Sequence, residues 1–474
     1  MYKLGQTYIE KLFNPGTIAV IGASEKQGTV GRAIMENLLR GFRGEVYPVN
    51  VKYETVLGLK CYKGIDELPK TPDLAVVAIP AASTLKVVEE LCKLGVRVSI
   101  VVSAGFKEIG EDGARLEIEL VKRARTCGMR ILGPNCLGVY DAWTGVDTIF
   151  NPGDRQSKPT PGSVAFLSQS GALGAALLDW LSEAGIGMSK FVSYGNAADI
   201  KEWELIEYLA YDGETRIISL YVEGVDNGRE FLNSLRKAAA AGKPVVILKG
   251  GRTPSGVRAV VSHTGALSSP SEVFLYAVRQ AGAIVVDSVS EMVGVLKLFE
   301  WFEPPKGRGI AIVTNGGGAG VLAVDATEAE GLRIANLSKE TIESLRRALP
   351  SAASPLNPVD LLGDAPPERY RAAIDLVIND INVDSVLIIT LMQSPAFDPH
   401  KFVEQLQDIR SRTTKPMVLV APGGEYTERH AKIIERKLRI PYFKSPEEAV
   451  KALRLSIEWF EKRARGTYYK QVQG

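Results

Sequence analysis

Short apolar runs alternate with amphipathic stretches from one end of the chain to the other. In the first third of the chain, the apolar runs predict five β-strands, at residues 17–22, 45–50, 74–79, 98–102 and 129–132. The stretches between them predict helices, and one of these has Ser83 as a candidate N-cap and Gly95 as a candidate C-terminal stop. Such alternation is typical of parallel sheets with helices on both faces. The sequence therefore predicts an α/β protein made of doubly wound parallel sheets.

The length of 474 residues and two breaks in the pattern predict three domains. The breaks are rich in Pro, Gly and Lys and lie at 151–162 and 303–309. We expect a Rossmann-like domain over 1–145, a flavodoxin-like domain over 160–302 and a second flavodoxin-like domain over 308–474. The last two open alike, with SVAFLSQSGALG and GIAIVTNGGGAG, and later share KPVVILKGG and KPMVLVAPGG. This repetition favours a duplicated domain over a chance likeness of buried strands.

Composition and charge exclude several classes of protein. Hydrophobic residues make up 45% of the chain, enough for several cores, and the formal net charge of +2 requires neither nucleic acid nor an anionic membrane as a partner. No apolar run reaches the ~18 residues of a membrane span, and the N-terminus lacks the apolar segment of a signal peptide. The cysteines are far apart, without a CxxC pair: Cys61, Cys92, Cys127 and Cys136. We therefore expect reduced thiols in a cytoplasmic protein.

A glycine-rich loop follows the first predicted strand. Gly22, Gly28 and Gly31 allow the backbone to approach a phosphate, and the next helix directs its amides at the same point. The second glycine of the dinucleotide fingerprint is replaced by Ser24, and Lys52 follows the second strand where an NAD site has an acidic residue. The loop therefore favours a ligand with an extra phosphate, CoA or NADP, over NAD. The alternative is a tight turn that binds no ligand.

Two further glycine-rich turns, at 168–174 and 314–320, each join a predicted buried strand to a helix. Backbone amides at such a helix N-terminus can bind a phosphate dianion, and the hydroxyls of Ser168 and Ser170 lie alongside in the first turn. The second turn offers mainly backbone groups, so close packing of helix on sheet is an equally good explanation of it. Neither turn is a GxxxxGK[ST] loop, so the chain shows no ATP site of that kind.

His263 is the one histidine of three that lies in a suggestive place. The segment around it, 250–269, is rich in Gly, Ser and Arg and predicts a long irregular loop, which inside a compact domain is usually functional. A neutral imidazole can attack an activated phosphoryl group, and a carboxylate best orients its second nitrogen. Glu223, at the end of a predicted buried strand, is the candidate carboxylate. A solvated loop histidine without a function is the alternative.

At this point the chain resembles a known family. The motifs GASEKQGTVG, VNVKY, VVAIPA, VSAGF, RILGPNCLG, FLSQSGALG, YVEG and VSHTGAL occur in the order found in the α subunit of succinyl-CoA synthetase. The resemblance is closer to the α subunit of the archaeal-type ADP-forming acetyl-CoA synthetases. It spans nearly the whole chain, because the third predicted domain resembles the C-terminal domain of the succinyl enzyme's β subunit.

The resemblance implies a role for each matching residue. Residues implied to bind CoA are Gly22, Ala23, Ser24, Glu25, Lys26, Gln27, Lys52, Val102, Ser103 and Ala104. His263 matches the phosphorylated histidine, and Glu223 matches the carboxylate that orients it. Residues implied to bind the phosphoryl group at two helix N-termini are Ser168, Gln169, Ser170, Gly171, Gly316, Gly317, Gly318 and Gly320.

The reaction implied is acyl-CoA + ADP + phosphate ⇌ carboxylate + ATP + CoA, through an acyl phosphate and a phosphohistidine. ATP-grasp domains are missing from the sequence, so a separate β subunit is implied to hold ADP or ATP and Mg²⁺, in a hetero-oligomer such as α2β2. Ala175 replaces a tyrosine of the succinyl enzyme, which argues against succinate as the acyl group.

Two rival functions and one unexplained motif stay open at this stage. An NADP-dependent oxidoreductase would explain Lys52 but would leave His263 and the two later turns unused. A regulatory CoA-binding protein without catalysis is the second rival, against which the retention of His263 and Glu223 speaks. The motif NPVDLLGDA (357–365) has no chemical role that we can derive, and helix capping by Asp364 would account for it.

Overall fold

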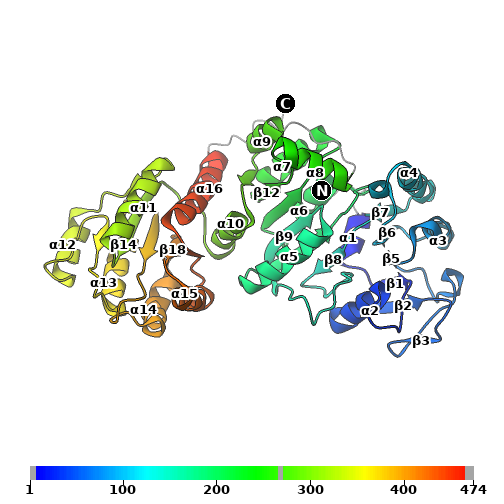
Figure 1. The fold of residues 1–474 in the computed structure, drawn as a ribbon, viewed down its shortest axis with the longest axis horizontal. Helices are drawn as coiled ribbons and strands as arrows, with labels where there is room; N and C mark the ends of the chain where they lie inside the picture. The colour runs from blue at the N-terminus through cyan, green and yellow to red at the C-terminus, as the bar shows by residue number, and fades with distance from the viewer. Residues whose placement is uncertain (1–6, 265–270, 465–474) are drawn as a thin grey trace. The chain divides into compact units, whose positions relative to one another are not determined.

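A computed structural model describes residues 7–264 and 271–464 of the chain, in two compact units. One unit reaches to Asp287 and the other begins at Ser288 (Figure 1). The first unit contains two large sheets and the second contains one. The predicted α/β class with three doubly wound, mainly parallel sheets is confirmed.

The first sheet has five parallel strands in the order β2-β1-β5-β6-β7. Its strands are β1 (Thr17–Ile21), β2 (Glu45–Val49), β5 (Leu74–Val77), β6 (Val98–Val101) and β7 (Arg130–Leu132). Its helices are α1 (Thr7–Phe13), α2 (Val30–Gly41), α3 (Ala81–Leu94) and α4 (Glu111–Thr126), with 3₁₀ turns η1 (Ile65–Glu67) and η2 (Lys107–Ile109) and a small hairpin of β3 (Thr55–Val56) and β4 (Leu59–Lys60). All five predicted strands are present, each within two residues of its predicted ends.

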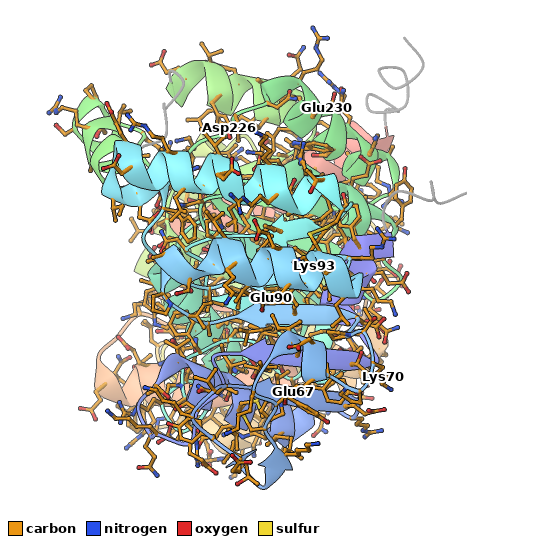
Figure 2. All side chains as sticks on the ribbon, turned by 90° about the vertical axis from the view of Figure 1, so that its right-hand side faces the viewer. Glu67, Lys70, Glu90, Lys93, Asp226 and Glu230 are labelled. Carbon is orange, nitrogen blue, oxygen red and sulfur yellow. A yellow bond between two sulfur atoms is a disulfide. The ribbon has the colours of Figure 1, made fainter. Side chains whose placement is uncertain are left out.

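Alternate residues of the first sheet face two separate cores. Val20 and Ile100 pack with Ile34 of α2 on one face, while Val77 packs with Val88 of α3 on the other. Figure 2 looks toward the second face, where α3 carries Glu90 and Lys93. Both faces are thus covered, which explains why these strands are nearly continuous apolar runs in the sequence.

The second sheet has the order β13-β12-β11-β9-β10-β8, with β8 antiparallel to β10 and the other pairs parallel. Its strands are β8 (Gly138–Asp141), β9 (Pro161–Ser168), β10 (Met188–Ser193), β11 (Ile217–Val222), β12 (Val245–Lys249) and β13 (Ile284–Val286). Its helices are α5 (Gly171–Glu183), α6 (Glu202–Tyr211), α7 (Gly228–Ala240), α8 (Pro254–Thr264) and α9 (Ser271–Gln280). Because β8 lies at 138–141, the chain enters the second sheet before residue 145.

The third sheet follows β15-β14-β17-β18-β19, with β16 also paired to β14. Its strands are β14 (Gly309–Thr314), β15 (Arg333–Ile334), β16 (Val359–Asp360), β17 (Ser385–Ile389), β18 (Met417–Val420) and β19 (Tyr442–Phe443). Its unit contains α10 (Val289–Trp301), α11 (Gly317–Ala329), α12 (Lys339–Ala348), α13 (Pro367–Ile378), α14 (Pro399–Arg412), α15 (Glu425–Leu438) and α16 (Pro446–Ala464). The predicted domain boundaries stay predictions. Helix α10, which lies inside the predicted 160–302 domain, belongs to the second unit.

With β8 and β16 left aside, each sheet has five strands. When these are numbered by their position in the sequence, all three sheets have the order 2-1-3-4-5. In this order, the loop after the first strand lies where the chain direction across the sheet reverses, and ligands bind at that point. All three glycine-rich turns follow such a first strand: β1, β9 and β14. Because the first sheet has this order as well, the expected duplication of the last two domains stays a prediction.

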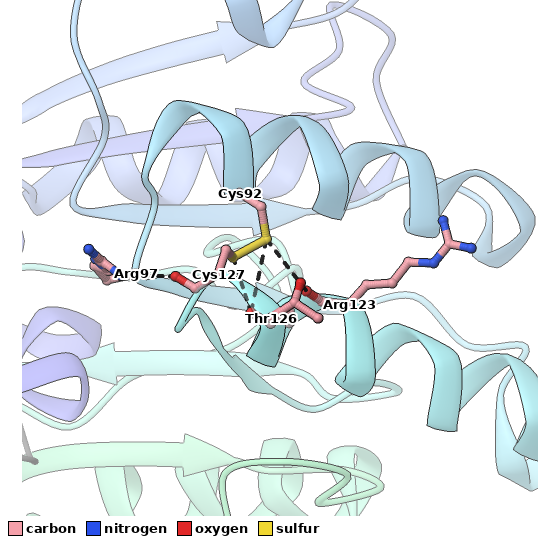
Figure 3. Close-up of a disulfide and its surroundings, with 6 residues drawn as sticks. Cys92, Arg97, Arg123, Thr126 and Cys127 are labelled. Carbon is pink, nitrogen blue, oxygen red and sulfur yellow. Dashed lines mark hydrogen bonds between the residues drawn. A yellow bond between two sulfur atoms is a disulfide. The ribbon is translucent and has the colours of Figure 1, made fainter.

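The expectation of four reduced thiols is wrong for one pair. Cys92, in the last turn of α3, and Cys127, after α4, form a disulfide, with their Cα atoms 5.6 Å apart (Figure 3). The spacing argument failed because 35 residues is close to one strand–helix repeat, which returns two consecutive helix ends to the same edge of the sheet. Cys61 and Cys136 are free and buried. The expected cytoplasmic location therefore has no support from the cysteines.

Two local features complete the comparison with the sequence. Gly95 ends α3 in the left-handed conformation, as predicted, but the N-cap is Pro80 and Ser83 lies inside the helix. Among the described residues, no helix is both long enough and apolar enough to cross a membrane.

Candidate active site

The loop after β1 is shaped by glycines whose backbones pass close to neighbouring strands and helices. Gly22 has φ +94°, and a Cβ there would overlap the carbonyl oxygen of Ala78. A Cβ on Gly31, at the start of α2, would overlap the carbonyl oxygen of Gly22. The N-terminus of α2 therefore lies directly against the end of β1, as a phosphate-binding turn requires.

Several predicted CoA-binding residues are held in place at the carboxyl edge of the first sheet. The Ser24 hydroxyl accepts a hydrogen bond from the Lys26 amide at 3.1 Å, and Glu25 forms an ion pair with Arg32. Lys52 is exposed, and its amide donates to the Asn50 side chain at 2.9 Å. The side chains of Lys26 and Gln27 are also exposed, so the loop presents both to a ligand from solvent.

The turn at 168–171 forms the N-terminus of α5. Ser168 is buried, and its hydroxyl donates to the Ser170 carbonyl at 2.7 Å, so it stabilises the turn. Ser170 is the N-cap, and its hydroxyl accepts from the Leu173 amide at 3.3 Å. The amides of Gly171 and Ala172, in the first turn of the helix, have no intrahelical acceptor, as at every helix start. They are the donors available to an anion.

A cavity with a volume of about 910 Å³ lies where the two sheets of the first unit meet. Its walls include Val102, Ser103 and Ala104 from the end of β6. The opposite wall includes Gln169, Ser170 and Gly171. The cavity therefore brings together six residues that the sequence assigned to two separate sites. Gly22–Gln27 and Lys52 lie at the same edge of the first sheet but are not among the lining residues.

Glu223, directly after β11, is buried and fixed from two sides. The Tyr221 hydroxyl donates to Glu223 Oε1 at 3.2 Å, and the Gln169 side-chain oxygen accepts from the Glu223 amide at 2.7 Å. Beneath it, buried Lys249 donates from Nζ to the Glu223 carbonyl at 2.8 Å. Burial and the neighbouring Glu223 carboxylate raise the pKa of Tyr221, so its hydroxyl stays protonated and keeps donating. The backbone of Glu223 is therefore tied to Gln169 in the turn that begins α5, while Tyr221 holds its carboxylate.

His263 lies in α8, so the expected long irregular loop is wrong over Pro254–Thr264. The helix begins where Thr253 caps it: the Thr253 hydroxyl accepts from the Gly256 amide at 3.1 Å, and Pro254 occupies the first helical position. This Thr-Pro start signal was present in the sequence but was outweighed by the Gly, Ser and Arg content. The His263 side chain lies outside the described residues, so its predicted pairing with Glu223 stays a prediction.

The turn of the second unit also forms a helix N-terminus. Gly316 is the N-cap of α11, and its amide donates to the Thr314 hydroxyl at 2.9 Å. Gly317 and Gly318 open the helix, and a Cβ on Gly318 would meet no neighbour, so this glycine leaves the turn accessible. Gly320 packs close to Thr314. The turn thus combines the two explanations given by the sequence: accessible amides at its start and close packing behind it.

The motif at 357–365 has a structural role in the second unit. The Asn357 side chain accepts from the Ile312 amide at 2.9 Å and donates to the Ile310 carbonyl at 2.8 Å, which ties the segment to β14. Asp364 does not cap a helix as expected; it pairs with Arg369 at 2.7 Å, and the N-cap of α13 is Pro366.

Sequence reasoning missed several residues that line the 910 Å³ cavity. The Asn135 and Asn196 side chains hydrogen-bond to each other at 3.2 Å within its lining, although 61 residues separate them. Cys136 also lines it, but burial raises the pKa of this thiol to about 12, so it is protonated at neutral pH and is a poor nucleophile. The motif RILGPNCLG was the signal that could have identified Asn135 and Cys136.

Comparison with known proteins agrees with this geometry. Three family models match in succession: a CoA binding domain over 16–142, a succinyl-CoA ligase-like flavodoxin domain over 161–299 and a ligase-CoA domain over 310–466. The chain is 37% identical to the α subunit of acetate–CoA ligase (ADP-forming) II of Pyrococcus furiosus, over 94% of this chain and 96% of that one. The chain belongs to the family of ADP-forming acetate–CoA ligase α subunits.

Other members of the acetate–CoA ligase family are also similar. Acetate–CoA ligase (ADP-forming) I of Archaeoglobus fulgidus is 41% identical over 94% of this chain, which spans 63% of the length of that relative. A solved acetyl-coenzyme A synthetase 1 of Ca. Korarchaeum cryptofilum, in complex with phosphate and ADP, has a TM-score of 0.91 at 33% identity and covers 98% of this chain and 99% of its own. The family likeness therefore extends over both units.

Proposed function

We propose that the chain is the α subunit of an ADP-forming acyl-CoA synthetase that interconverts acyl-CoA, ADP and phosphate with carboxylate, ATP and CoA. The observation that supports this most directly is the shared cavity. Ser103, at the implied CoA site, and Ser170, at the implied phosphate site, line the same space. A thioester and a phosphate bound there would lie close enough to react, which is the main requirement of such catalysis.

The first two steps then use groups of this chain. Phosphate bound at the amides of Gly171 and Ala172 attacks the thioester, which gives an acyl phosphate and CoA. His263 takes the phosphoryl group and releases the carboxylate, while Glu223 holds the second imidazole nitrogen. The accessible amides of Gly317 and Gly318 are a second proposed phosphate site. Phosphoryl transfer depends mainly on such positioning and on stabilisation of charge.

The last transfer, from phosphohistidine to ADP, requires a partner. We propose a separate ATP-grasp β subunit that holds the nucleotide and Mg²⁺, in a hetero-oligomer such as α2β2. The subunit names of the Pyrococcus relatives support a second chain. We place the assembly in the cytoplasm, where CoA thioesters and ADP are available.

The acyl group is the least constrained part of the proposal. Ala175, which replaces the tyrosine of the succinyl enzyme, lines the cavity and leaves room beside α5. The first acid to test is acetate, because it is the acid named for the relatives of highest identity. A panel of larger carboxylates would then show how much of the cavity the acyl group uses.

The proposal is tested by phosphorylation of the chain. Incubation with acetyl-CoA and labelled phosphate, or with the β partner and labelled ATP, should attach one acid-labile, base-stable phosphoryl group. His263→Ala should abolish the label, and His400→Ala, which changes an exposed histidine on α14, is the control. Label that persists in His263→Ala would contradict the assignment, and tight binding of NADP without binding of CoA would favour an oxidoreductase instead.

A further inference from the structure

The side chain of Gln169 has one orientation that its hydrogen bonds permit. Its oxygen accepts from the backbone amides of Glu223 at 2.7 Å and Gly224 at 3.1 Å. Backbone N–H groups can only donate, so the atom that faces them must be Oε1 and not Nε2. The two N–H bonds of Nε2 therefore point away from the Glu223 loop.

Gln169 is also a lining residue of the 910 Å³ cavity, next to Ser170 and Gly171. Among the described residues, the structure gives Nε2 no acceptor for either hydrogen, and the side chain is only partly buried. An amide group with two unused donors, fixed by its oxygen, is a preorganised donor site. It lies beside the helix amides that we assign to phosphate and in the same cavity as Ser103.

We propose that Gln169 is a catalytic residue whose Nε2 donates to the acyl carbonyl oxygen of the thioester, an inference that rests on the proposed function. A phosphate oxygen forms a bond to the carbonyl carbon, and the C=O π electrons move to oxygen, where Nε2 stabilises the negative charge. When this pair returns, the C–S bond breaks and its electrons leave with sulfur. The proton of HPO₄²⁻ passes to the thiolate, so thioester and phosphate give acyl phosphate and CoA thiol with charge conserved.

The orientation of Gln169 also suits the rest of the site. Its oxygen joins the α5 turn to the strand end that carries Glu223, so the carbonyl donor and the orienting carboxylate are parts of one rigid connection. Removal of the N–H donors while an oxygen is retained should slow the acyl chemistry more than any other step. Removal of the oxygen as well should also loosen the Glu223 loop.

The test uses two variants of the full chain with its β partner. Gln169→Glu keeps an oxygen for the two backbone amides but has no N–H donor, and Gln169→Met has neither. Gln407→Glu, on the exposed side of α14, controls for the added charge. We expect Gln169→Glu to slow labelling of His263 from acetyl-CoA and phosphate about 100-fold, the usual effect of losing one oxyanion donor. Labelling from ATP through the β subunit, which involves no acyl carbonyl, should fall by a much smaller factor.

Three outcomes would count against Gln169. Wild-type labelling of Gln169→Glu from acetyl-CoA would show that only the oxygen matters. Equal loss of labelling from both donors would show that the added charge repels phosphate or that the site is distorted. A rate for Gln169→Met that equals wild type would remove any role of the side chain. If the wild-type chain is labelled from neither donor, the proposed function itself fails, whatever the variants do.

Discussion

At Gly31 the backbone of α2 passes so close to the end of β1 that no side chain fits between them. We expect Gly31→Ala to push the helix N-terminus away from the loop and to weaken CoA binding more than tenfold, at a cost of about 1–3 kcal/mol in stability from overpacking. Calorimetric titration with CoA and urea unfolding measure the two effects. Gly228→Ala is the control, because a Cβ at this helix start meets no atom within 4 Å. Unchanged CoA affinity in Gly31→Ala would show that the loop does not bind CoA through this helix end.

Glu202, the first residue of α6, gives a second prediction at the residue scale. Burial raises its pKa from 4.5 to about 7, while its own backbone amide and Lys201 lower it and Asp226 and Glu204 raise it further. The folded chain thus keeps the proton up to about pH 7, whereas the unfolded chain loses it near pH 4.5. The contribution of Glu202 to the free energy of unfolding is therefore greatest below pH 4.5. It decreases as the pH rises from 4.5 to about 7, and it stays at its lower value above pH 7.

Glu202→Gln removes this titration. The variant should gain stability relative to wild type as the pH rises from 5 to 8, by at most about 3 kcal/mol. Urea unfolding at both pH values measures the gain, and Glu272→Gln, on the exposed side of α9, is the control variant. A constant difference between Glu202→Gln and wild type across this range would contradict the assigned pKa.

At the scale of elements, the strands of the first sheet followed from the sequence, and the starts of α3 and α8 did not. Apolar runs located all five strands of the first sheet because both faces of that sheet are buried. Gly95 ended α3 as expected, because it adopts the left-handed conformation that glycine allows without a steric cost. Ser83 was wrong as a cap because Pro80 already starts the helix, and the composition of 250–269 concealed the start of α8 at Thr253.

The cavity could be predicted only in part, and the reason is again at the scale of elements. Each motif identified one wall, because residues at the carboxyl end of a parallel strand lie at the ligand-binding edge of a sheet. The contact between Asn135 and Asn196 depends on the pairing of β8 with β10. Nothing local in the sequence indicates that antiparallel pairing, so the meeting of the two walls could not be derived from it.

The cap of α8 can be tested directly. Thr253→Ala removes the hydroxyl that accepts from the Gly256 amide and should destabilise the helix by about 1 kcal/mol. Hydrogen exchange in α8 should then become about fivefold faster. Ser255→Ala, in the first turn but not the cap, is the control. Exchange that is unchanged in Thr253→Ala would show that α8 is stabilised by packing and not by its cap.

At the scale of the whole molecule, the disulfide and the cavity lie at opposite edges of the first sheet. Cys92 and Cys127 are at helix ends that precede β6 and β7, whereas Val102 and Ser103 follow β6. Cys92→Ser, Cys127→Ser and wild type treated with dithiothreitol should therefore lose similar stability, about 2–4 kcal/mol. None should change CoA affinity by more than twofold. A large loss of CoA affinity on reduction would show that the two edges are coupled.

The strand β8 determines how the first unit can be divided. The strands that precede β8 in the sequence form the first sheet. Strand β8 itself pairs with Lys190–Ser193 of β10 and is an edge strand of the second sheet. A protein cut between residues 145 and 160 and expressed as two pieces would leave one piece with an orphan strand and the other with the bare edge of β10. Both are templates for aggregation. The two sheets of the first unit therefore have to be expressed together. A gene fusion or subunit split in this family that preserved activity would have to fall elsewhere in the chain.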